Sequence, residues 1–361
     1  MRIRELILQP FRNFAQFSLA FEADRTLILG HNGQGKSNVL EAISYLSIGK
    51  SIRGSQDRQV VPHGEKHFDV QGLCNDGQRD CQIRVFYAGA EGKKAFCDGA
   101  ALPRVSDILG TFKTVHFSPE DVSLVLRFPA QRRRALDILI SQSSLSYLRD
   151  LQRYMRTLAQ RNHLLRTAQK NNQALSEGVL EPWDAQVAEL GSRIRAQRLS
   201  TLEAMCGPFA AYYQRFSQQR EHAALVYQGP TPGTEEELRA QLLAELAEKR
   251  ERELRQGHTL CGPQRDDLSF RLDDKPAEIY GSEGQLKTIL ISWKLAEVRF
   301  LEQLGGQMPV LLLDDALSEL DAKRAEQLLE IVDEFEQVIL TTPWEPEAGL
   351  KSRFAEIRLS A

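Results

Sequence analysis

The stretch GHNGQGKS at residues 30–37 follows the apolar run TLIL and precedes NVLEAISYLSIG, a run long enough for a helix. It fits the pattern GxxxxGK[ST]. Glycines let a backbone curl so that successive N–H groups point inward, and a following helix adds its positive N-terminal end. The succession of strand, loop and helix therefore predicts a phosphate-binding loop. Its expected members are Gly30, His31, Asn32, Gly33, Gln34, Gly35, Lys36 and Ser37.

Two positions of this loop and a second stretch predict the chemistry at the phosphates. Lys36 is expected to reach the β- and γ-phosphates of ATP as a binding and catalytic group, and Ser37 to offer its hydroxyl to Mg²⁺. The stretch PVLLLDD at 309–315 is typical of a buried strand that ends in two acids. We expect Asp314 to bind Mg²⁺ and Asp315 to act as a catalytic group near the attacking water.

The stretch GSEGQLKTILISWKLAEVRFLEQLG at 281–305 predicts a helix with a second phosphate-binding end. Because the loop at 30–37 already holds one triphosphate, the economical arrangement is two protomers placed head to tail. Each would offer Ser282, Gly284 and Gln285 to the γ-phosphate held by the other. Asp321, in SELD at 318–321, is expected at the same interface. An ordinary helix cap is the alternative for SEGQ taken alone.

Composition excludes several classes of protein. The chain has 361 residues and a net charge of -3, so a site for nucleic acid has to be a local basic patch. The five cysteines form no CxxC pair, which favours free thiols in a reducing cytosol. Charges interrupt the apolar residues of the N-terminal stretch, and no apolar run reaches the roughly 18 residues of a membrane helix. We expect a cytoplasmic protein with no membrane segment.

The pattern along the chain predicts two lobes. Residues 1–120 contain short strand patterns and one long helix, after the loop. Helical periodicity runs from about Pro119 to about Leu254, with breaks at 171–183 and 227–237, and strand patterns return at DLSFRL, VLLLDD and QVILTT. We therefore predict a discontinuous lobe of residues 1–120 and 258–361 and a helical insertion of residues 121–257.

The order of these motifs resembles that of the ABC-type ATPases, and the residues around them resemble the RecF family of bacterial recombination and repair ATPases. The stretches that carry the resemblance are FRNF at 11–14, GHNGQGKSNVLEAISYLSIGKSIR at 30–53, FSPED at 117–121, PAQRRRALD at 129–137, QRN at 160–162, PWD at 182–184, CGPQRDDLSF at 261–270 and LLLDDALSELD at 311–321. They span nearly the whole chain in the family's order.

The resemblance implies an α/β fold: an ABC-type P-loop ATPase lobe, with a mixed sheet and helices, and an inserted, mainly helical second lobe. It implies a dimer formed on ATP that binds single- and double-stranded DNA at the junctions of gaps. It also implies work with RecO and RecR to load RecA, in replication restart and the SOS response to DNA damage. Arg12 matches FRNF and is expected either near the nucleotide or on the surface beside the first strand.

Several positions depart from the related patterns. Many ABC ATPases carry Glu where this chain has Asp315, one methylene shorter, so we expect weak ATP hydrolysis that serves as a switch and is stimulated by DNA. Thr341 and Thr342 stand where transporters place a switch histidine, and Gln264 stands where the RecF family often has His. FSPED lacks the glutamine that related ATPases often have there, which leaves the link between nucleotide and helical lobe unassigned.

A basic segment predicts where DNA could lie. Between Gln131 and Lys170 there are nine Lys or Arg residues and two acids. At helical spacing Arg149, Arg153 and Arg156 share one face, and the opposite face is expected to be apolar, formed by Tyr147, Leu151, Tyr154, Met155 and Leu158. The basic face predicts a track for DNA phosphates. A solvated face with intramolecular ion pairs is the alternative.

Two other functions share part of these motifs. The ATPase subunit of a membrane transporter has the same loop and signature, but Thr341 and the long insertion disfavour it. The head of a chromosome-structuring protein would need long coiled-coil arms, for which the sequence has no sustained heptads.

Overall fold

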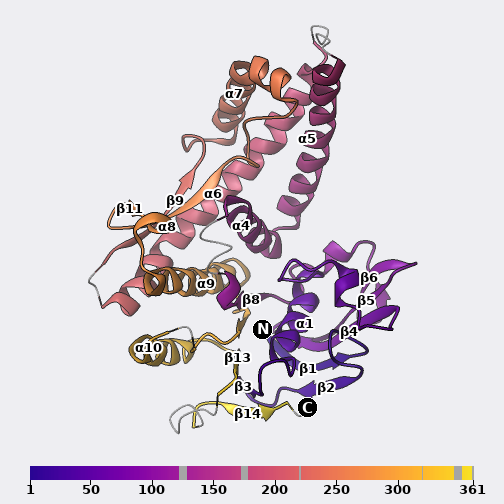
Figure 1. Cartoon of the computed structure of the whole chain (residues 1–361), viewed down its shortest axis with the longest axis vertical. Helices are drawn as coiled ribbons and strands as arrows, with labels where there is room; N and C mark the ends of the chain where they lie inside the picture. The colour runs from indigo at the N-terminus through magenta and orange to yellow at the C-terminus, as the bar shows by residue number, and fades with distance from the viewer. Residues whose placement is uncertain (122–127, 172–177, 219–220, 319, 345–351, 360–361) are drawn as a thin grey trace. The chain divides into compact units, whose positions relative to one another are not determined.

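The structure is a computed structural model that describes residues 1–121, 128–171, 178–218, 221–318, 320–344 and 352–359. The chain forms two compact units (Figure 1). Unit 1 comprises residues 1–124, 208–222 and 281–361, and unit 2 comprises residues 125–207 and 223–280. These units differ from the predicted lobes at three places: residues 121–124 and 208–222 group with unit 1, and residues 258–280 group with unit 2.

Unit 1 contains two sheets. The antiparallel sheet has the order β2-β1-β4-β5-β6-β7, and its strands are β1 (Arg2–Leu8), β2 (Phe17–Ala20), β4 (His67–Asn75), β5 (Asp80–Ala88), β6 (Gly92–Cys97) and β7 (Ala100–Ala101). The parallel sheet has the order β14-β3-β13-β12-β8, and its strands are β3 (Arg25–Leu29), β8 (Thr114–Phe117), β12 (Val310–Leu313), β13 (Val338–Thr342) and β14 (Ala355–Arg358). All residues of β12 and β13 are buried, as expected for interior strands of a parallel sheet.

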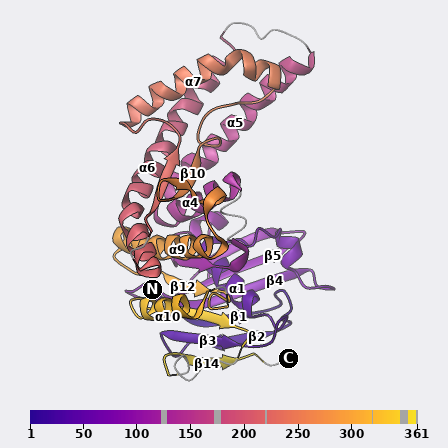
Figure 2. The same ribbon diagram turned by 60° about the vertical axis from the view of Figure 1, so that its left-hand side comes forward.

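Helix α1 (Lys36–Ile48) contacts strands of both sheets, β4 and β5 of one and β8 and β13 of the other. Eleven of its residues are buried, because it has apolar partners on both sides. The helix ends at Gly49, which takes a left-handed conformation and donates its N–H to the Tyr45 carbonyl. The other helices of unit 1 are α2 (Asp57–Val60), the 3₁₀ helix η1 (Val105–Ile108), α9 (Glu283–Gly305) and α10 (Ala322–Val332). Figure 2 shows α10 beside the parallel sheet.

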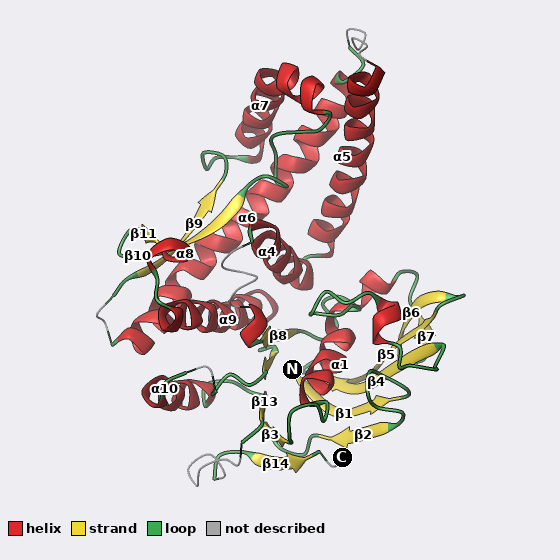
Figure 3. Cartoon of the chain, viewed as in Figure 1, coloured by secondary structure: helices red, strands yellow, loops and turns green. Residues whose placement is uncertain are grey.

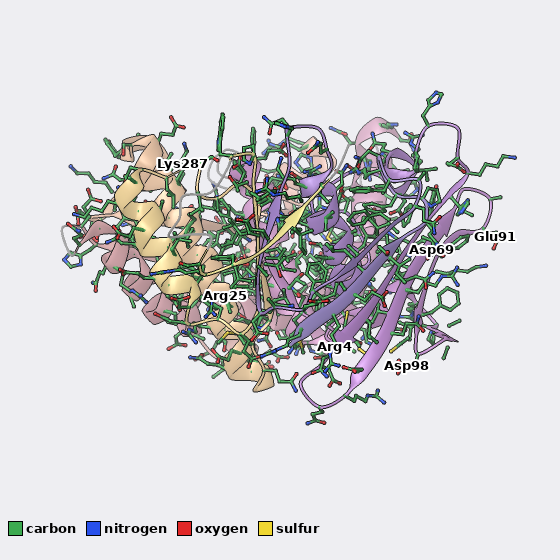
Figure 4. The ribbon with its side chains drawn as sticks, turned by 90° about the horizontal axis from the view of Figure 1, so that it is seen from below. Arg4, Arg25, Asp69, Glu91, Asp98 and Lys287 are labelled. Carbon is green, nitrogen blue, oxygen red and sulfur yellow. The ribbon has the colours of Figure 1, made fainter. Side chains whose placement is uncertain are left out.

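Two ion pairs lie on the antiparallel sheet. Figure 4 labels one residue of each pair, Asp69 and Arg4. Asp69 of β4 is buried and pairs with Arg84 of β5, with 2.5 Å between Nη2 and Oδ2. At the sheet's other end, Arg4 of β1 lies 3.1 Å from Asp80 of β5. These cross-strand pairs stabilise the strand register beside α1.

Unit 2 is mainly helical (Figure 3). Its helices are α4 (Pro129–Ser143), α5 (Leu145–Asn171), α7 (Glu235–Gln256), α8 (Ala277–Tyr280) and most of α6 (Glu181–Ser217). A small antiparallel sheet has the order β11-β10-β9, with β9 at Ala223–Gln228, β10 at Asp267–Leu272 and β11 at Lys275–Pro276. Within the described ranges, no helix has the length and apolar character that a bilayer crossing requires.

Most predicted elements are confirmed. The strands predicted in the first 120 residues and the later strands at DLSFRL, VLLLDD and QVILTT are present. The prediction of helix between the two breaks is wrong at β9, and β14 was not predicted. Pairing of β9 with β10 also explains why residues 258–280 belong to unit 2. The first predicted break lies partly outside the described residues, and α6 begins within it, at Glu181.

Candidate functional site

The loop at residues 30–37 connects β3 to α1, as predicted. Gly33 and Gly35 have φ of 89° and 101°, conformations that side chains with a Cβ rarely adopt. A Cβ on Gly35 would lie 2.7 Å from Asn13 Oδ1, so glycine is required there for space as well. The exposed stretch His31, Asn32 and Gly33 forms the outer part of the loop.

Lys36 folds back into this loop. Its Nζ donates to the Gly30 carbonyl at 2.6 Å and to the His31 carbonyl at 3.1 Å. Burial lowers the pKa of the Lys36 ammonium, while the carboxylates of Asp315 and Asp314 act in the opposite direction. A cation partly removed from water and close to two acids is suited to receive an anionic ligand.

Ser37 and Asp314, the two predicted Mg²⁺ ligands, are in contact. The Ser37 hydroxyl donates to Asp314 Oδ1 at 2.9 Å. Thr341 of β13 donates to the same oxygen at 2.7 Å and accepts the Asp315 N–H at 3.0 Å. Because β12 lies next to β13 in the parallel sheet, the ends of the two strands bring these groups together. Residues 277 positions apart thus form one polar centre beside Lys36.

Asp315 has a left-handed backbone, with φ of 48°. Its carboxylate accepts the Ser318 hydroxyl. A non-glycine residue in this conformation directly after a buried strand is a strained arrangement of the kind found at functional sites.

Three side chains at this centre were not predicted from the sequence: Asn13, Asn38 and Arg53. Asn13 donates to the Gln34 carbonyl at 3.2 Å and accepts from Asn38 at 2.8 Å, so it braces the loop from the side. Arg53 lies 3.7 Å from Asp314 Oδ2 and donates to Asn38 Oδ1 at 3.3 Å. Asn13 lies in FRNF, and Asn38 and Arg53 lie in the quoted stretch at 30–53, so the available signal was their position inside these two stretches.

Arg12 contacts a buried acid of α1. It forms two hydrogen bonds to Glu41, at 2.7 and 2.8 Å, and also donates to Ser55 at 2.8 Å and to the Gln59 carbonyl at 3.2 Å. Glu41 is fully buried, and Arg12 is its charged partner. Through these contacts Arg12 connects α1 to the segment at 55–59.

His116 of β8 lies beside the acidic strand β12. Burial lowers the pKa of His116 to about 4, although Asp314 acts in the opposite direction. Its Nδ1 is 4.0 Å from Asp121. The imidazole is therefore neutral at physiological pH and adds no positive charge beside Asp314.

The predicted second phosphate-binding end is the N-terminus of α9. Ser282 and Gln285 form a capping box: the Gln285 N–H donates to Ser282 Oγ at 3.3 Å, and the Ser282 N–H donates to Gln285 Oε1 at 2.7 Å. Ser282 is exposed. A Cβ on Gly284 would lie 2.7 Å from Arg324 Nη1, so glycine leaves room for that guanidinium.

Asp321 caps α10. Its carboxylate accepts the Arg324 N–H at 2.9 Å and lies 3.4 Å from Arg324 Nη1. The contacts of Arg324 thus connect Asp321 to Gly284 within one chain.

These residues fit ATP and Mg²⁺. The glycine conformations leave the backbone free to surround phosphates, and Lys36 supplies a cation inside the loop. The oxygens of Ser37 and Asp314 are hard ligands of the kind Mg²⁺ prefers. Among the described residues, no group of three or more His, Cys, Asp or Glu forms another metal site.

The predicted basic face is present on α5 in unit 2. Arg149, Arg153 and Arg156 are exposed, and Arg156 donates only to the Gln152 carbonyl of its own helix among the bonds of the described residues. Tyr147, Tyr154 and Leu158 are buried on the opposite face, as predicted, whereas Leu151 is half-buried. Met155 was predicted to be buried but is 51% exposed, because it lies next to Arg156 at the edge of the apolar stripe.

Two arginines counted in the basic segment are buried and paired. Arg161 contacts Asp184 and Glu253, each at 2.7 Å, and Arg132 contacts Asp267 at 2.6 Å. These ion pairs stabilise unit 2. Arg161 and Arg132 therefore do not contribute to the exposed basic face of α5.

Gln264, at the position where the RecF family often has His, also has structural partners. Its Oε1 accepts the Tyr154 hydroxyl and its Nε2 donates to the Cys261 carbonyl at 2.6 Å. The next acid along the chain, Asp266, binds Arg195 at 2.9 Å and Tyr227 at 2.8 Å. The motif around Gln264 therefore braces unit 2.

The fold and this site define a P-loop ATPase of the ABC type, with a head like those of SMC proteins. Residues 2–354 match the family described as RecF/RecN/SMC N terminal domain. The chain belongs to the RecF family.

Its relatives support this assignment along the whole chain. It is 39% identical to a DNA replication and repair protein RecF of Heliobacterium modesticaldum, covering 95% of this chain and 92% of the relative. It is 36% identical to the protein of the same name from Salinibacter ruber, covering 96% and 87%.

Solved structures agree. The chain superposes on the recombination mediator protein RecF with ATPrS in the RecFOR pathway with a TM-score of 0.89 at 31% identity, covering 99% of this chain and 96% of the other. The structure of RecF with ATP gives a TM-score of 0.88 at 34% identity, covering 96% and 93%. An SMC head bound to a domain of ScpA shares the fold, with a TM-score of 0.56 at 16% identity over 99% of this chain and 94% of that one.

Proposed function

We propose that this chain is an ATP-dependent DNA-binding protein of recombinational repair. Two copies close on ATP, bind DNA at the single-strand/double-strand junctions of gaps, and work with RecO and RecR in the cytoplasm to load RecA and restart replication. The observation that carries the proposal is the contact between Ser37 and Asp314 beside Lys36, in a chain that belongs to the RecF family.

The loop supplies binding and orientation. Lys36 Nζ, which contacts the Gly30 and His31 carbonyls, would bind the β- and γ-phosphates. The backbone N–H groups of residues 33–36 would surround them. Ser37 and Asp314 would hold Mg²⁺, which would neutralise negative charge on the phosphate oxygens. Thr341 fixes the Asp314 oxygen that Ser37 also contacts.

Hydrolysis is slow in this proposal. Asp315 is one methylene shorter than the Glu common in ABC ATPases, and its carboxylate accepts the Ser318 hydroxyl. A weak general base suits a switch that holds the DNA-bound dimer until hydrolysis releases it. Turnover at the rate of a transporter without DNA would contradict this part of the proposal.

The site is completed by a second copy. Ser282, Gly284 and Gln285 of one protomer bind the γ-phosphate held by the loop of the other, with Asp321 at the same interface. Support comes from the exposed position of Ser282 at the N-terminus of a helix of 23 residues.

A sedimentation experiment tests the proposal. We expect a monomer without nucleotide, a dimer with ATP and Mg²⁺, and a larger complex when gapped DNA is added. A dimer that is indifferent to DNA would favour a transporter-type ATPase instead. A chain that hydrolyses ATP normally as a monomer would rule out the shared site.

A Lys36→Arg variant tests the cycle. We expect it to bind ATP but to hydrolyse it poorly, because the bulkier guanidinium keeps the charge and misplaces the donors. Its complex with DNA should persist in ATP after a challenge with competitor DNA, whereas the wild-type complex decays. Prompt release of the variant would contradict the clamp cycle.

A further inference from the structure

The C-terminal end of α6 belongs to unit 1, although the rest of this helix belongs to unit 2. Phe209, Tyr212, Tyr213 and Phe216 follow helical spacing and are all buried. Arg299 of α9 donates to the Tyr212 hydroxyl at 2.8 Å, and Gln327 of α10 donates to the Arg215 carbonyl at 2.8 Å. This end of α6 thus contacts α9, the helix that carries Ser282, Gly284 and Gln285, three residues called the signature below.

Glu221 follows this end of α6 and reaches the signature itself. Its Oε1 accepts Gln285 Nε2 at 2.7 Å, and its Oε2 accepts the Tyr213 hydroxyl at 2.8 Å. Both carboxylate oxygens are used, one toward α9 and one toward α6.

The amide of Gln285 has only one orientation that satisfies its neighbours. Its Oε1 accepts the Ser282 N–H at 2.7 Å, and its Nε2 therefore faces Glu221. Turning the amide would place two donors against each other at Ser282 and two acceptors against each other at Glu221. Glu221 consequently fixes the Gln285 side chain that closes the capping box.

We propose that Glu221 is a positioning residue for the signature. This inference rests on the proposed function, because the signature matters only if a partner's triphosphate reaches it. Glu221 acts through Gln285 and Ser282, holding the first turn of α9 ready for phosphate. Tyr213 holds Glu221 from α6, and α6 continues along the chain into unit 2.

Hydrogen exchange in the nucleotide-free chain tests the contact independently of ATP and DNA. We expect the hydrogen-bonded amides of Ser282, Gln285 and Leu286 to exchange about tenfold faster in Glu221→Ala, because the hydrogen bond of Gln285 to a charged acceptor is lost. Glu221→Gln keeps an acceptor for Gln285 and should lie between Glu221→Ala and wild type. Glu330→Ala, on an exposed residue of α10, is the matched control and should exchange like wild type. Unchanged exchange in Glu221→Ala would overturn the proposal.

Tyr213→Phe provides a second variant if Glu221→Ala fails to fold. It removes the hydroxyl that holds Glu221 and leaves Glu221 and Gln285 intact. We expect a smaller increase in exchange at the amides of Ser282, Gln285 and Leu286, of about threefold. No change in a folded Tyr213→Phe protein would mean that α6 does not hold Glu221, and would overturn the link to α6.

Mixed dimers test the role in ATP hydrolysis. Lys36→Ala chains lack a working loop and Gly284→Asp chains lack a working signature, so their mixture regains activity if sites are shared. Glu221→Ala should regain activity with Lys36→Ala, which contributes an intact signature, and should not regain it with Gly284→Asp. The opposite pattern would overturn the positioning role. If Lys36→Ala and Gly284→Asp do not restore each other, the proposed shared site fails, and the exchange experiment still decides whether Glu221 orders α9.

Discussion

Glu41 of α1 is fully buried. Its carboxylate can stay charged only because other side chains bind it. Arg12 binds both of its oxygens, and the Ser51 hydroxyl donates to one of them. A buried carboxylate without its cation is strongly destabilising, whereas the pair together costs little. The burial of Glu41 in α1, the helix after the loop, thus depends on Arg12.

An Arg12→Ala variant should therefore lower the free energy of unfolding by about 3 kcal/mol, because Glu41 loses its charged partner. Urea unfolding of the nucleotide-free chain measures the change. Arg58→Ala, on an exposed residue of α2, is the control and should change stability by no more than about 0.5 kcal/mol. Unchanged stability together with a tenfold loss of ATP affinity would instead indicate that Arg12 contacts nucleotide.

Site residues that belong to one continuous segment can be predicted from the sequence better than residues that folding brings together from distant segments. The loop at 30–37 is one segment, and its pattern alone predicts all eight members. The contact of Arg53 with Asp314 depends on how the segment after α1 folds back, and no spacing in the sequence encodes that. The same holds for Asn13, which reaches the loop from the segment after β1.

Among the elements, α6 is the longest helix of the described residues, at 37 residues, and it contains Pro208 in its interior. Proline removes a helical hydrogen bond and its ring crowds the preceding turn. Pro208 is also the residue at which the helix passes from unit 2 to unit 1. The weakest point of the helix therefore coincides with the boundary between the units.

A Pro208→Ala variant should raise the free energy of unfolding by about 2 kcal/mol, because it restores the missing N–H and relieves the ring contact. Pro182→Ala is the matched control, since Pro182 is in the first turn of the same helix, where an N–H has no helical partner. It should change stability by no more than about 0.5 kcal/mol. Urea unfolding compares the two. A destabilised Pro208→Ala protein would mean that packing of the ring outweighs the lost hydrogen bond.

Elements with strong local patterns are predictable here, and elements that depend on distant partners are not. The buried strand VLLL and the helix after the loop follow from their own residues. Strand β9 lies in a region dominated by helical spacing, and its partner β10 begins about forty residues later. Strand β14 is half polar, and its pairing with β3 decides its conformation.

For the whole molecule, the exposed arginines of α5 are the main test of where DNA binds. Reversing Arg149, Arg153 and Arg156 to Glu should weaken DNA binding at least tenfold in ATP, because three phosphate contacts become repulsive. The slope of log affinity against log salt should fall by about 2 to 3. Fluorescence anisotropy with a gapped duplex measures both.

The control for this prediction reverses Lys249, Arg252 and Arg255 of α7, which changes the net charge equally on another helix of unit 2. If both triple variants lose affinity to the same extent, the effect is one of net charge. If the α5 variant binds DNA as wild type does at low salt, the basic face is a solvated surface and DNA binds elsewhere.

The arrangement of unit 1 along the chain has a consequence for synthesis on the ribosome. Strand β3 lies between β13 and β14, so Arg25 pairs with Val338. At about 5–20 residues per second, the partners of β3 emerge tens of seconds after it. Strand β3 therefore stays unpaired while all of unit 2 is synthesised, and its apolar residues stay exposed. We expect holdase chaperones to bind the nascent chain during that time.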